Sequence, residues 1–225
     1  MMTRGVRTRA AQGIRTPRQE RSRQSFERVL DAATELLMEV GYDGLTLAGV
    51  SARAGVSTGS IYGRIRGKDD LLTAVQARIL ERTEAGQDAM LARLQAGELP
   101  LDTLVPRAVD ALGDFMQEYA GLLRPLMAQA MADIAVAGRG KASYGKLRDG
   151  WIAVILSRRD DIAQRPADAA VLGCFRIAYA AFARYLGLGS SMESAGEGDW
   201  AALKRNLGVM CLAFLKTPAG ESSEG

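Results

Sequence analysis

The segment from Gly55 to Lys68 reads GVSTGSIYGRIRGK and concentrates hydrogen-bond donors in one short span. Hydroxyl, guanidinium and ammonium groups are the donors that contact phosphate oxygens, and such contacts set the register and orientation of a bound polymer. Apolar residues recur through the same span at helical spacing, so we expect the donors on short helices. The donor side chains are those of Ser57, Ser60, Tyr62, Arg64, Arg66 and Lys68.

Positive charge is concentrated before this segment. The first thirty residues hold eight arginines against Glu20 and Glu27, whereas the whole chain of 225 residues has a net charge of only +3. We expect residues 1–20 to form a disordered basic arm that meets a polyanion. Two alternatives stay open: a solvated tail without a ligand, and an arm that binds acidic protein or a membrane surface.

The elements that position the donors are predicted to be helices. An apolar face from Phe26 to Val40 predicts a helix that begins at Ser22 and ends at Gly41. Thr46 caps a second helix that Gly55 ends, and Ser57 caps a third that runs through Gly63 to Gly67. Two short helices joined by a tight turn indicate a helix-turn-helix, whose second helix enters the DNA major groove. An ordinary helical hairpin is the alternative.

The rest of the chain is predicted to be helical as well, which makes the fold class all-α. A long helix begins at KDDLL and runs to Ala96, with apolar residues at Leu71, Leu72, Val75 and Ile79 and again at Met90, Leu91 and Leu94. Further helices are expected at about 101–118, 121–136, 141–158, 167–187 and 199–216. Glycines at 138 and 140 and the loop 187–199 are expected to separate some of these helices.

Several classes of protein are disfavoured by the composition. The chain has no histidine and shows no nucleophile motif or paired carboxylates, so we expect no enzyme and no cofactor. Cys174 and Cys211 lie in apolar patterns, which predicts buried free thiols in a cytoplasmic protein; a redox switch stays open. No apolar run is long enough to cross a membrane. No metal site is expected from this residue set.

The stretch VLDAATELLMEVGYDGLTLAGVSARAGVSTGSIYGRIRGKDDLL, residues 29–72, resembles the TetR family of bacterial transcription regulators. The resemblance implies an N-terminal three-helix DNA-binding domain and a C-terminal helical domain that binds a ligand and dimerises. It also implies that the positions matching the family's base and phosphate contacts have these roles here. These DNA-binding positions are Thr46, Ser57, Thr58, Gly59, Ser60, Tyr62, Gly63, Arg64 and Lys68.

The sequence departs from the family pattern at several positions. Gly49 stands where an acidic residue often completes the cap of Thr46, and Ser51 replaces a common alanine. Gly63 replaces an aromatic or polar residue, Arg64 a histidine and Ile65 a phenylalanine. The departures leave the architecture intact, but the operator sequence does not follow from the resemblance.

The second domain is expected to enclose a ligand pocket, since methionines and aromatics form adaptable pocket walls. A plain core is the alternative, because such stripes are usually core. The expected ligand is organic and mostly apolar, with Arg176 or Arg184 as anchors for an anionic group or, alternatively, as surface charges. The predicted ligand-binding residues are Phe115, Met116, Tyr119, Met127, Met131, Trp151, Phe175 and Tyr179.

Two apolar helices at the end of the chain predict a homodimer through a four-helix bundle. We therefore predict a repressor that a small organic effector releases from a palindromic double-stranded DNA operator, with no membrane partner. A non-inducible or activating regulator without a ligand pocket is the alternative. The predicted domains are 1–20 (arm), 21–67 (DNA-binding), 68–217 (ligand-binding and dimerisation) and 218–225 (disordered tail). The predicted interface residues are Val171, Phe182, Leu203, Leu207, Met210 and Phe214.

Overall fold

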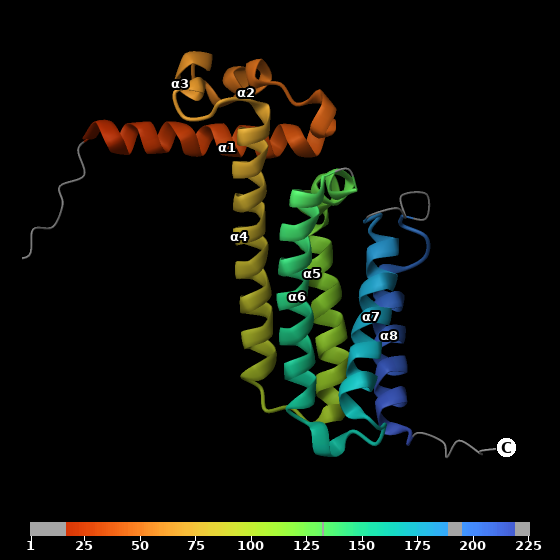
Figure 1. The fold of residues 1–225 in the computed structure, drawn as a ribbon. Helices are drawn as coiled ribbons and strands as arrows, with labels where there is room; N and C mark the ends of the chain where they lie inside the picture. Colours follow the sequence, from red (N-terminus) through yellow and green to blue (C-terminus); the bar gives the residue numbers. More distant parts are fainter. Residues whose placement is uncertain (1–16, 132, 189–194, 219–225) are drawn as a thin grey trace, which may run out of the picture.

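The computed structural model describes residues 17–131, 133–188 and 195–218, which form α-helices and one 3-10 turn and contain no strand. The all-α prediction is therefore confirmed for these ranges. Three helices form a small module that sits across one end of a bundle made by the rest (Figure 1). The helices are α1 (Pro17–Gly44), α2 (Leu47–Ala54), α3 (Thr58–Tyr62), α4 (Lys68–Gln95), α5 (Leu101–Ala130), α6 (Ile134–Leu156), α7 (Ala167–Tyr185) and α8 (Trp200–Lys216), with the 3-10 turn at Arg159–Asp161.

Local caps delimit the short helices of the module. The Thr46 hydroxyl accepts a hydrogen bond from the amide of Gly49 at 3.1 Å, and the Ser57 hydroxyl accepts one from the amide of Ser60 at 3.3 Å. Gly55 has a φ of 62° and ends α2 in the left-handed conformation, which favours glycine. The caps predicted at Thr46, Gly55 and Ser57 are confirmed.

An acidic stripe on α1 pairs with arginines of α2 and α4. Glu27, Asp31, Glu35 and Glu39 are spaced four apart, so they lie along one face of the helix. Arg53 of α2 lies 2.7 Å from Glu39 and 3.8 Å from Glu35. Hydrogen bonding to Arg53 lowers the pKa of Glu39 below its ordinary value. The two halves of the stripe contact different helices: Glu35 and Glu39 pair with α2, and Glu27 and Asp31 pair with an arginine of α4.

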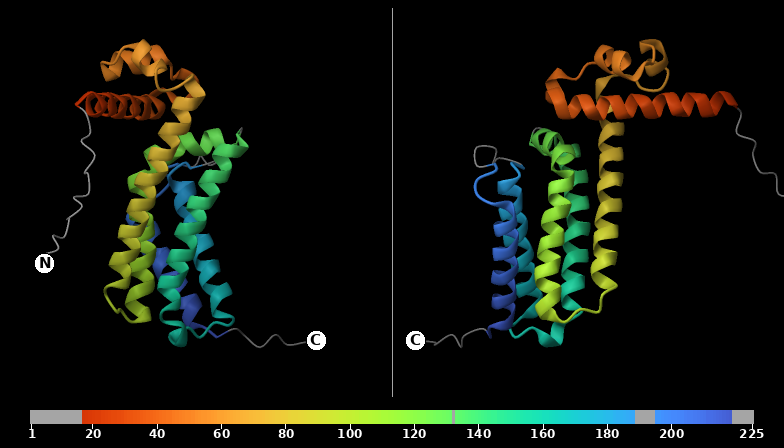
Figure 2. Two further views of the ribbon diagram at one scale, coloured as in Figure 1. Left: turned by 60° about the vertical axis from the view of Figure 1, so that its left-hand side comes forward. Right: turned by 180° about the vertical axis from the view of Figure 1, so that it is seen from behind.

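The bundle is organised around α5, which packs against α1, α4, α6, α7 and α8. The indole N–H of Trp151 on α6 donates to the carbonyl of Ala108 on α5 at 2.9 Å, so the largest buried side chain also satisfies its polar atom. Gly208 of α8 lets that helix approach closely, because a Cβ there would lie 3.2 Å from Cα of Pro106. Figure 2 shows α4, α5 and α6 side by side and the pair α7–α8 next to them.

Outside the helix-turn-helix, three predictions of helix boundaries are wrong. The first helix begins at Pro17 and not at Ser22, because proline is tolerated in a first turn and Glu20 bridges to Arg23 and Gln24. A single α5 replaces the two helices predicted around position 120, since Ala120 and Leu122 are buried and their packing outweighs the cost of Gly121.

The third error concerns α6, which begins at Ile134 and not near 141. The Asp133 carboxylate accepts hydrogen bonds from the amides of Ala135 at 2.8 Å and Val136 at 3.2 Å, and this cap starts the helix before the two glycines. Most of the predicted arm, residues 1–16, and most of the predicted tail, residues 219–225, lie outside the described residues, as does segment 189–194.

Candidate nucleic-acid interface and cavity

The turn between α2 and α3 is fastened by a serine hydroxyl. Ser51 donates to the carbonyl of Val56 at 2.7 Å and accepts from the hydroxyl of Thr58 at 3.2 Å. The sequence prediction gave Ser51 no hydrogen-bonding role, so these hydroxyl contacts were missed. The replacement of a common alanine by serine was the available signal. These two hydrogen bonds of Ser51 connect α2 to the start of α3, and the polar residues of α3 point outward.

The outward face of α3 carries most of the predicted DNA-contacting positions. Tyr62 is 55% exposed, and no residue in the described ranges hydrogen-bonds its hydroxyl. Thr58, Gly59 and Ser60 are also exposed, whereas Ile61 is fully buried and anchors the helix. The helix lies at the outer end of the molecule, away from the bundle (Figures 1 and 2).

Gly63 does not lie inside a helix, so this prediction is wrong. The helix ends at Tyr62, and Gly63 is its C-cap with φ −66° and ψ −10°. A Cβ there would meet the carbonyl oxygens of Ser60 at 3.5 Å and Gly59 at 3.7 Å, which are ordinary contacts. The cap forms because Ile65 is buried and turns the chain back toward the core, which ends α3 early.

Two of the predicted phosphate contacts are cations held against aromatic rings of α1. The guanidinium of Arg64 lies 5.2 Å from the ring centre of Phe26 and donates to the hydroxyl of Ser22 at 2.5 Å. The ammonium of Lys68 lies 4.5 Å from the ring centre of Tyr42. Such cation–π contacts orient the side chains and leave the charges at the surface.

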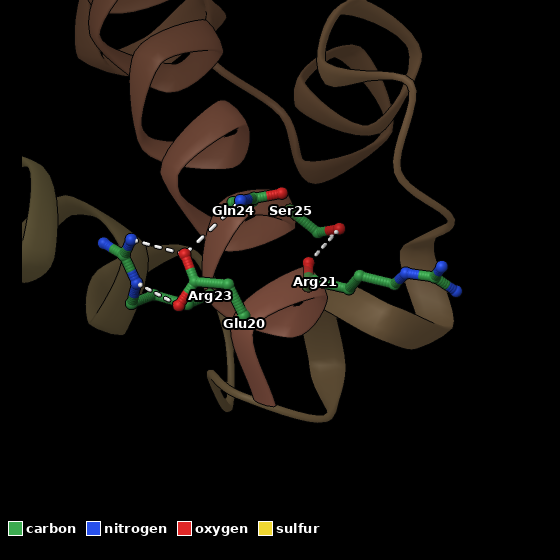
Figure 3. A network of polar contacts seen from close by, with 5 residues as sticks. All are labelled: Glu20, Arg21, Arg23, Gln24 and Ser25. Carbon is green, nitrogen blue, oxygen red and sulfur yellow. Dashed lines mark hydrogen bonds and ion pairs between the residues drawn. The ribbon is translucent and has the colours of Figure 1, made fainter. Parts of the chain in front are cut away.

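A groove of about 370 Å³ separates the first half of α1 from the helix-turn-helix, and it is rich in cations. Arg21, Arg28 and Arg64 line it together with hydroxyls of Ser25 and Ser57. Figure 3 shows the guanidinium of Arg21 directed away from the Glu20–Arg23 pair. Within the described ranges no carboxylate pairs with Arg21, so its charge stands unneutralised beside the groove.

A cavity of about 540 Å³ lies in the bundle between α4, α5, α6 and α7. Its α5 wall is apolar and includes Met116, Leu123 and Met127. Of the predicted ligand-binding residues, four line the cavity: Met116, Met127, Met131 and Tyr179.

The other four predicted ligand-binding residues pack in the core instead. Trp151 and Phe175 are fully buried and lie 5.6 Å apart between ring centres, and Phe115 and Tyr119 form a second pair at 5.0 Å. None of the four is among the residues that line the cavity. The predicted anionic anchors lie elsewhere too: Arg176 is exposed, and Arg184 is exposed and pairs with Glu197 at 2.8 Å.

Buried polar side chains gather at this cavity. In the described ranges the buried polar or charged residues are Gln76, Thr83, Gln87 and Ser143, and all four line the cavity. Burial raises the pKa of Tyr179, a fifth polar lining group, to about 12, so its hydroxyl keeps its proton and can donate. The cavity is therefore apolar on its α5 side and offers hydrogen bonds on its α4 side.

Gln76 links the cavity to the region next to α1. Its amide nitrogen donates to the carbonyl of Val136 at 3.2 Å, and its oxygen accepts from Nε of Arg139 at 2.7 Å. A cleft of about 150 Å³ on the other side of Gln76 is lined by Tyr42 of α1 and Asp69 of α4. The Tyr42 hydroxyl donates to Asp69 at 3.1 Å, and this bond raises the pKa of Tyr42 above its ordinary value.

The predicted dimer residues divide into two groups. Val171, Phe182 and Leu207 are buried within the protomer, so they offer no surface to a partner chain. Leu203 is half-buried and packs against the core. The remaining two, Met210 and Phe214, are exposed together with Ile177 and Val209, at exposed fractions of 45–65%.

The thiols of Cys174 and Cys211 are free and buried, which confirms that prediction. The pKa of Cys174 is raised by its contact with Cys211 and by burial. Across residues 17–131, 133–188 and 195–218 no group of side chains forms a metal site, and no helix there is long and apolar enough to span a bilayer.

The helix-turn-helix has known relatives. Residues 29–75 match the family described as bacterial regulatory proteins, tetR family. The chain is 39% identical over 61 residues to the class D tetracycline repressor of Escherichia coli, which is 27% of this chain and 28% of that protein. It is 40% identical over 82 residues to the transcriptional regulator BetI of Escherichia coli O45:K1, covering 34% of this chain and 40% of BetI. The matches therefore span less than half of either curated relative.

Solved structures resemble the chain over almost its whole length. A TetR-family regulator from Mesorhizobium loti superposes with a TM-score of 0.66, covers 87% of this chain and 96% of its own, and is 20% identical. GusR of Salmonella enterica superposes with a TM-score of 0.60, covers 90% and 99%, and is 19% identical. At such identities the superpositions establish the fold, and the family match applies to the helix-turn-helix: residues 29–75 belong to the TetR family of bacterial regulatory proteins.

Proposed function

We propose that the chain is a homodimeric DNA-binding transcriptional regulator, a repressor that a small organic ligand releases from a palindromic operator. The observation that carries the proposal is the continuity of α4. This helix begins at Lys68, next to the module, and about three of its turns, from Gln76 to Gln87, wall the cavity. A ligand that shifts α4 therefore acts on the helix-turn-helix through one rigid element.

The proposed DNA surface combines the exposed face of α3 with the cationic groove beside it. Tyr62 has a free hydroxyl in the described part of the chain, and Arg21 has no acidic partner there. The groove lies at the same outer end of the molecule, so a phosphate strand beside α3 would pass the guanidinium groups. Residues 46, 57–60, 62–64 and 68 belong to this proposed surface.

The proposed homodimer uses the exposed apolar face of α7 and α8 in place of the buried residues predicted from sequence. Helices α7 and α8 lie on the side of the bundle opposite α4. Their exposed apolar residues are Ile177, Val209, Met210 and Phe214. Burying them against a second copy removes apolar surface from water, at about 25 cal/mol per Å². A two-fold axis there would place two copies of α3 on one DNA duplex.

A cavity with buried polar walls favours ligand release over the alternative, a regulator without a ligand pocket. The proposal assigns no catalytic step and places the protein in the cytoplasm, where the DNA of a bacterium lies. The proposal keeps the predicted domains and extends the DNA-binding domain to the start of α1 at Pro17.

Footprinting on the DNA upstream of the chain's own gene tests the proposal. We expect protection of a palindrome by the wild type and weaker protection by Tyr62→Phe, which removes only an exposed hydroxyl. The matched control is Tyr185→Phe on α7, outside the module, where the hydroxyl donates to the carbonyl of Gly198; this variant should protect as wild type does. Equal binding to unrelated DNA of the same length would contradict the proposal.

A further inference from the structure

Two of the polar side chains that line the cavity have no hydrogen-bond partner in the described ranges, whereas Gln76 and Thr83 are bonded within the protein. Gln87 and Ser143 are each 4% exposed, and in the described ranges neither side chain hydrogen-bonds another group. Their polar atoms are not among the fully buried atoms without a partner, so they are accessible from the cavity and free to bond a molecule there. Both side chains line the cavity, so a bound molecule with hydroxyl or carbonyl groups would satisfy them.

Three polar side chains of α4 lie along the cavity in one line with Leu80. Gln76, Leu80, Thr83 and Gln87 line the cavity at steps of four, three and four, so they share one helix face. At 1.5 Å per residue the line from Gln76 to Gln87 is about 16 Å long. An elongated ligand would therefore present one polar edge to α4.

The opposite wall accepts only apolar surface. The α5 residues of the cavity are leucines, methionines and an alanine, without a polar side chain among them. A straight alkyl chain would satisfy this wall and leave the amide of Gln87 unpaired. A ligand with polar groups on both edges would lose its own hydrogen bonds against Met116 and Leu126.

The cavity lining contains one charge, the ammonium of Lys141. Lys141 is exposed at the cavity and has no carboxylate within ion-pair distance among the described residues. Lys146, one turn along α6 and outside the cavity, is by contrast paired with Glu84 at 2.5 Å. An anionic group at the end of the ligand would neutralise Lys141, and no acidic lining residue would oppose it.

We infer that the ligand is a facially amphipathic carboxylate: a rigid molecule with an apolar edge, hydroxyl or carbonyl groups on the other edge, and an anionic end at Lys141. The inference rests on the proposed ligand-responsive function and names the chemical class of its effector. Gln87 and Ser143 are assigned to the polar edge, and the α5 methionines to the apolar edge.

Three related probes separate these features in calorimetric titrations of the full chain. Deoxycholate has hydroxyls on one face and a carboxylate, 5β-cholanate keeps the rings and carboxylate without hydroxyls, and methyl deoxycholate keeps the hydroxyls without charge. We expect the wild type to bind deoxycholate about tenfold more tightly than either of the other two, as one good hydrogen bond or charge contact allows.

Two variants assign the preferences to residues. Gln87→Leu should remove the preference for deoxycholate over 5β-cholanate while 5β-cholanate still binds, which also shows that the cavity is intact. Lys141→Gln should equalise deoxycholate and its methyl ester. The matched controls are Gln95→Leu, an exposed glutamine on α4, and Lys146→Gln, a lysine of α6 outside the cavity; both should keep the wild-type preferences.

The inference is overturned if 5β-cholanate or the ester binds the wild type as tightly as deoxycholate, if both preferences survive in the variants, or if none of the three probes binds. Operator binding, measured separately, distinguishes this failure from that of the proposed function. Binding of deoxycholate without release of DNA would contradict the proposed release and support the inference. DNA binding without binding of any probe would overturn the inference and support the DNA-binding part of the proposed function.

Discussion

Arg78 joins the helix that walls the cavity to the module that carries the helix-turn-helix. Its guanidinium lies 2.6 Å from Glu27 and 2.6 Å from Asp31, both on α1. Arg78→Met keeps the apolar stem of the side chain and removes the charge, so it tests the ion pairs apart from packing.

The expected magnitude follows from the exposure of the three side chains. Arg78 is 34% exposed, Glu27 45% and Asp31 57%, so water screens both pairs. Exposed pairs contribute about 0.2–1 kcal/mol each, and we expect the loss of both to cost about 1 kcal/mol in the free energy of unfolding. For a chain of this length that lowers the Tm by about 2–4 °C.

Thermal melts followed by circular dichroism measure the difference, with Arg82→Met as the matched control. Arg82 is exposed one turn further along α4 and has no ion pair in the described part of the chain, so its Tm should match the wild type. In 1 M salt, where the Debye length is about 3 Å, the difference between the two variants should shrink. Equal melting of Arg78→Met and Arg82→Met, or a difference that salt leaves unchanged, would refute the reasoning.

Four further predictions concern the DNA surface, the dimer and the linker to α4. Gly63→Ala should stabilise the free protein by about 0.4–1 kcal/mol, because its backbone conformation suits alanine, and should weaken operator binding more than non-specific binding; unchanged operator affinity would exclude a close approach of Gly63 to DNA. Arg64→Gln should reduce the slope of log affinity against log salt by about 0.9 if Arg64 contacts one phosphate, and an unchanged slope would exclude that contact. Met210→Asp should shift sedimentation from dimer to monomer without lowering helicity, whereas a wild-type monomer at micromolar concentration would contradict the dimer. Hydrogen bonds from the amide and guanidinium of Arg66 lower the pKa of Asp70 in the folded state. The Asp70 carboxylate therefore stabilises the fold above its ordinary pKa of 3.8, and this stabilisation is lost as the pH falls through the lowered pKa. Chemical denaturation of Asp70→Asn should show less acid destabilisation than the wild type, and parallel pH profiles would count against this account.

The DNA-binding module was predictable because its signals are local. Thr46, Gly55 and Ser57 act within three or four residues of their own positions, so the caps follow from residue type and spacing. The acidic stripe of α1 was present in the sequence as acids four apart, but its partners Arg53 and Arg78 lie on other helices. Only the packing of α1 against α2 and α4 identifies which charges meet.

The bundle was less predictable because a glycine there can either end a helix or lie inside one. In the sequence Gly121 resembles a helix break, but α5 continues past it because its neighbours are buried and their packing stabilises the helix. Similarly, an aromatic at helical spacing is compatible with either a core or a cavity wall. Trp151 and Phe175 pack against each other and Tyr179 reaches the cavity, and this division depends on how α6 and α7 are rotated relative to each other.

The sequence nevertheless contains one non-local sign of the cavity, in the apolar pattern of α4. The apolar residues that predict this helix stop at Ile79 and resume at Met90, and the buried residues between them are Thr83 and Gln87. A helix that keeps polar residues on its buried face conflicts with the usual pattern, and such conflicts are expected at functional sites. From the sequence alone, the interruption of the apolar pattern could equally mean that this part of α4 faces solvent. The structure excludes that explanation, because Thr83 and Gln87 are only 2% and 4% exposed. The interruption therefore coincides with the α4 wall of the cavity, on the same helix that begins next to the DNA-binding module.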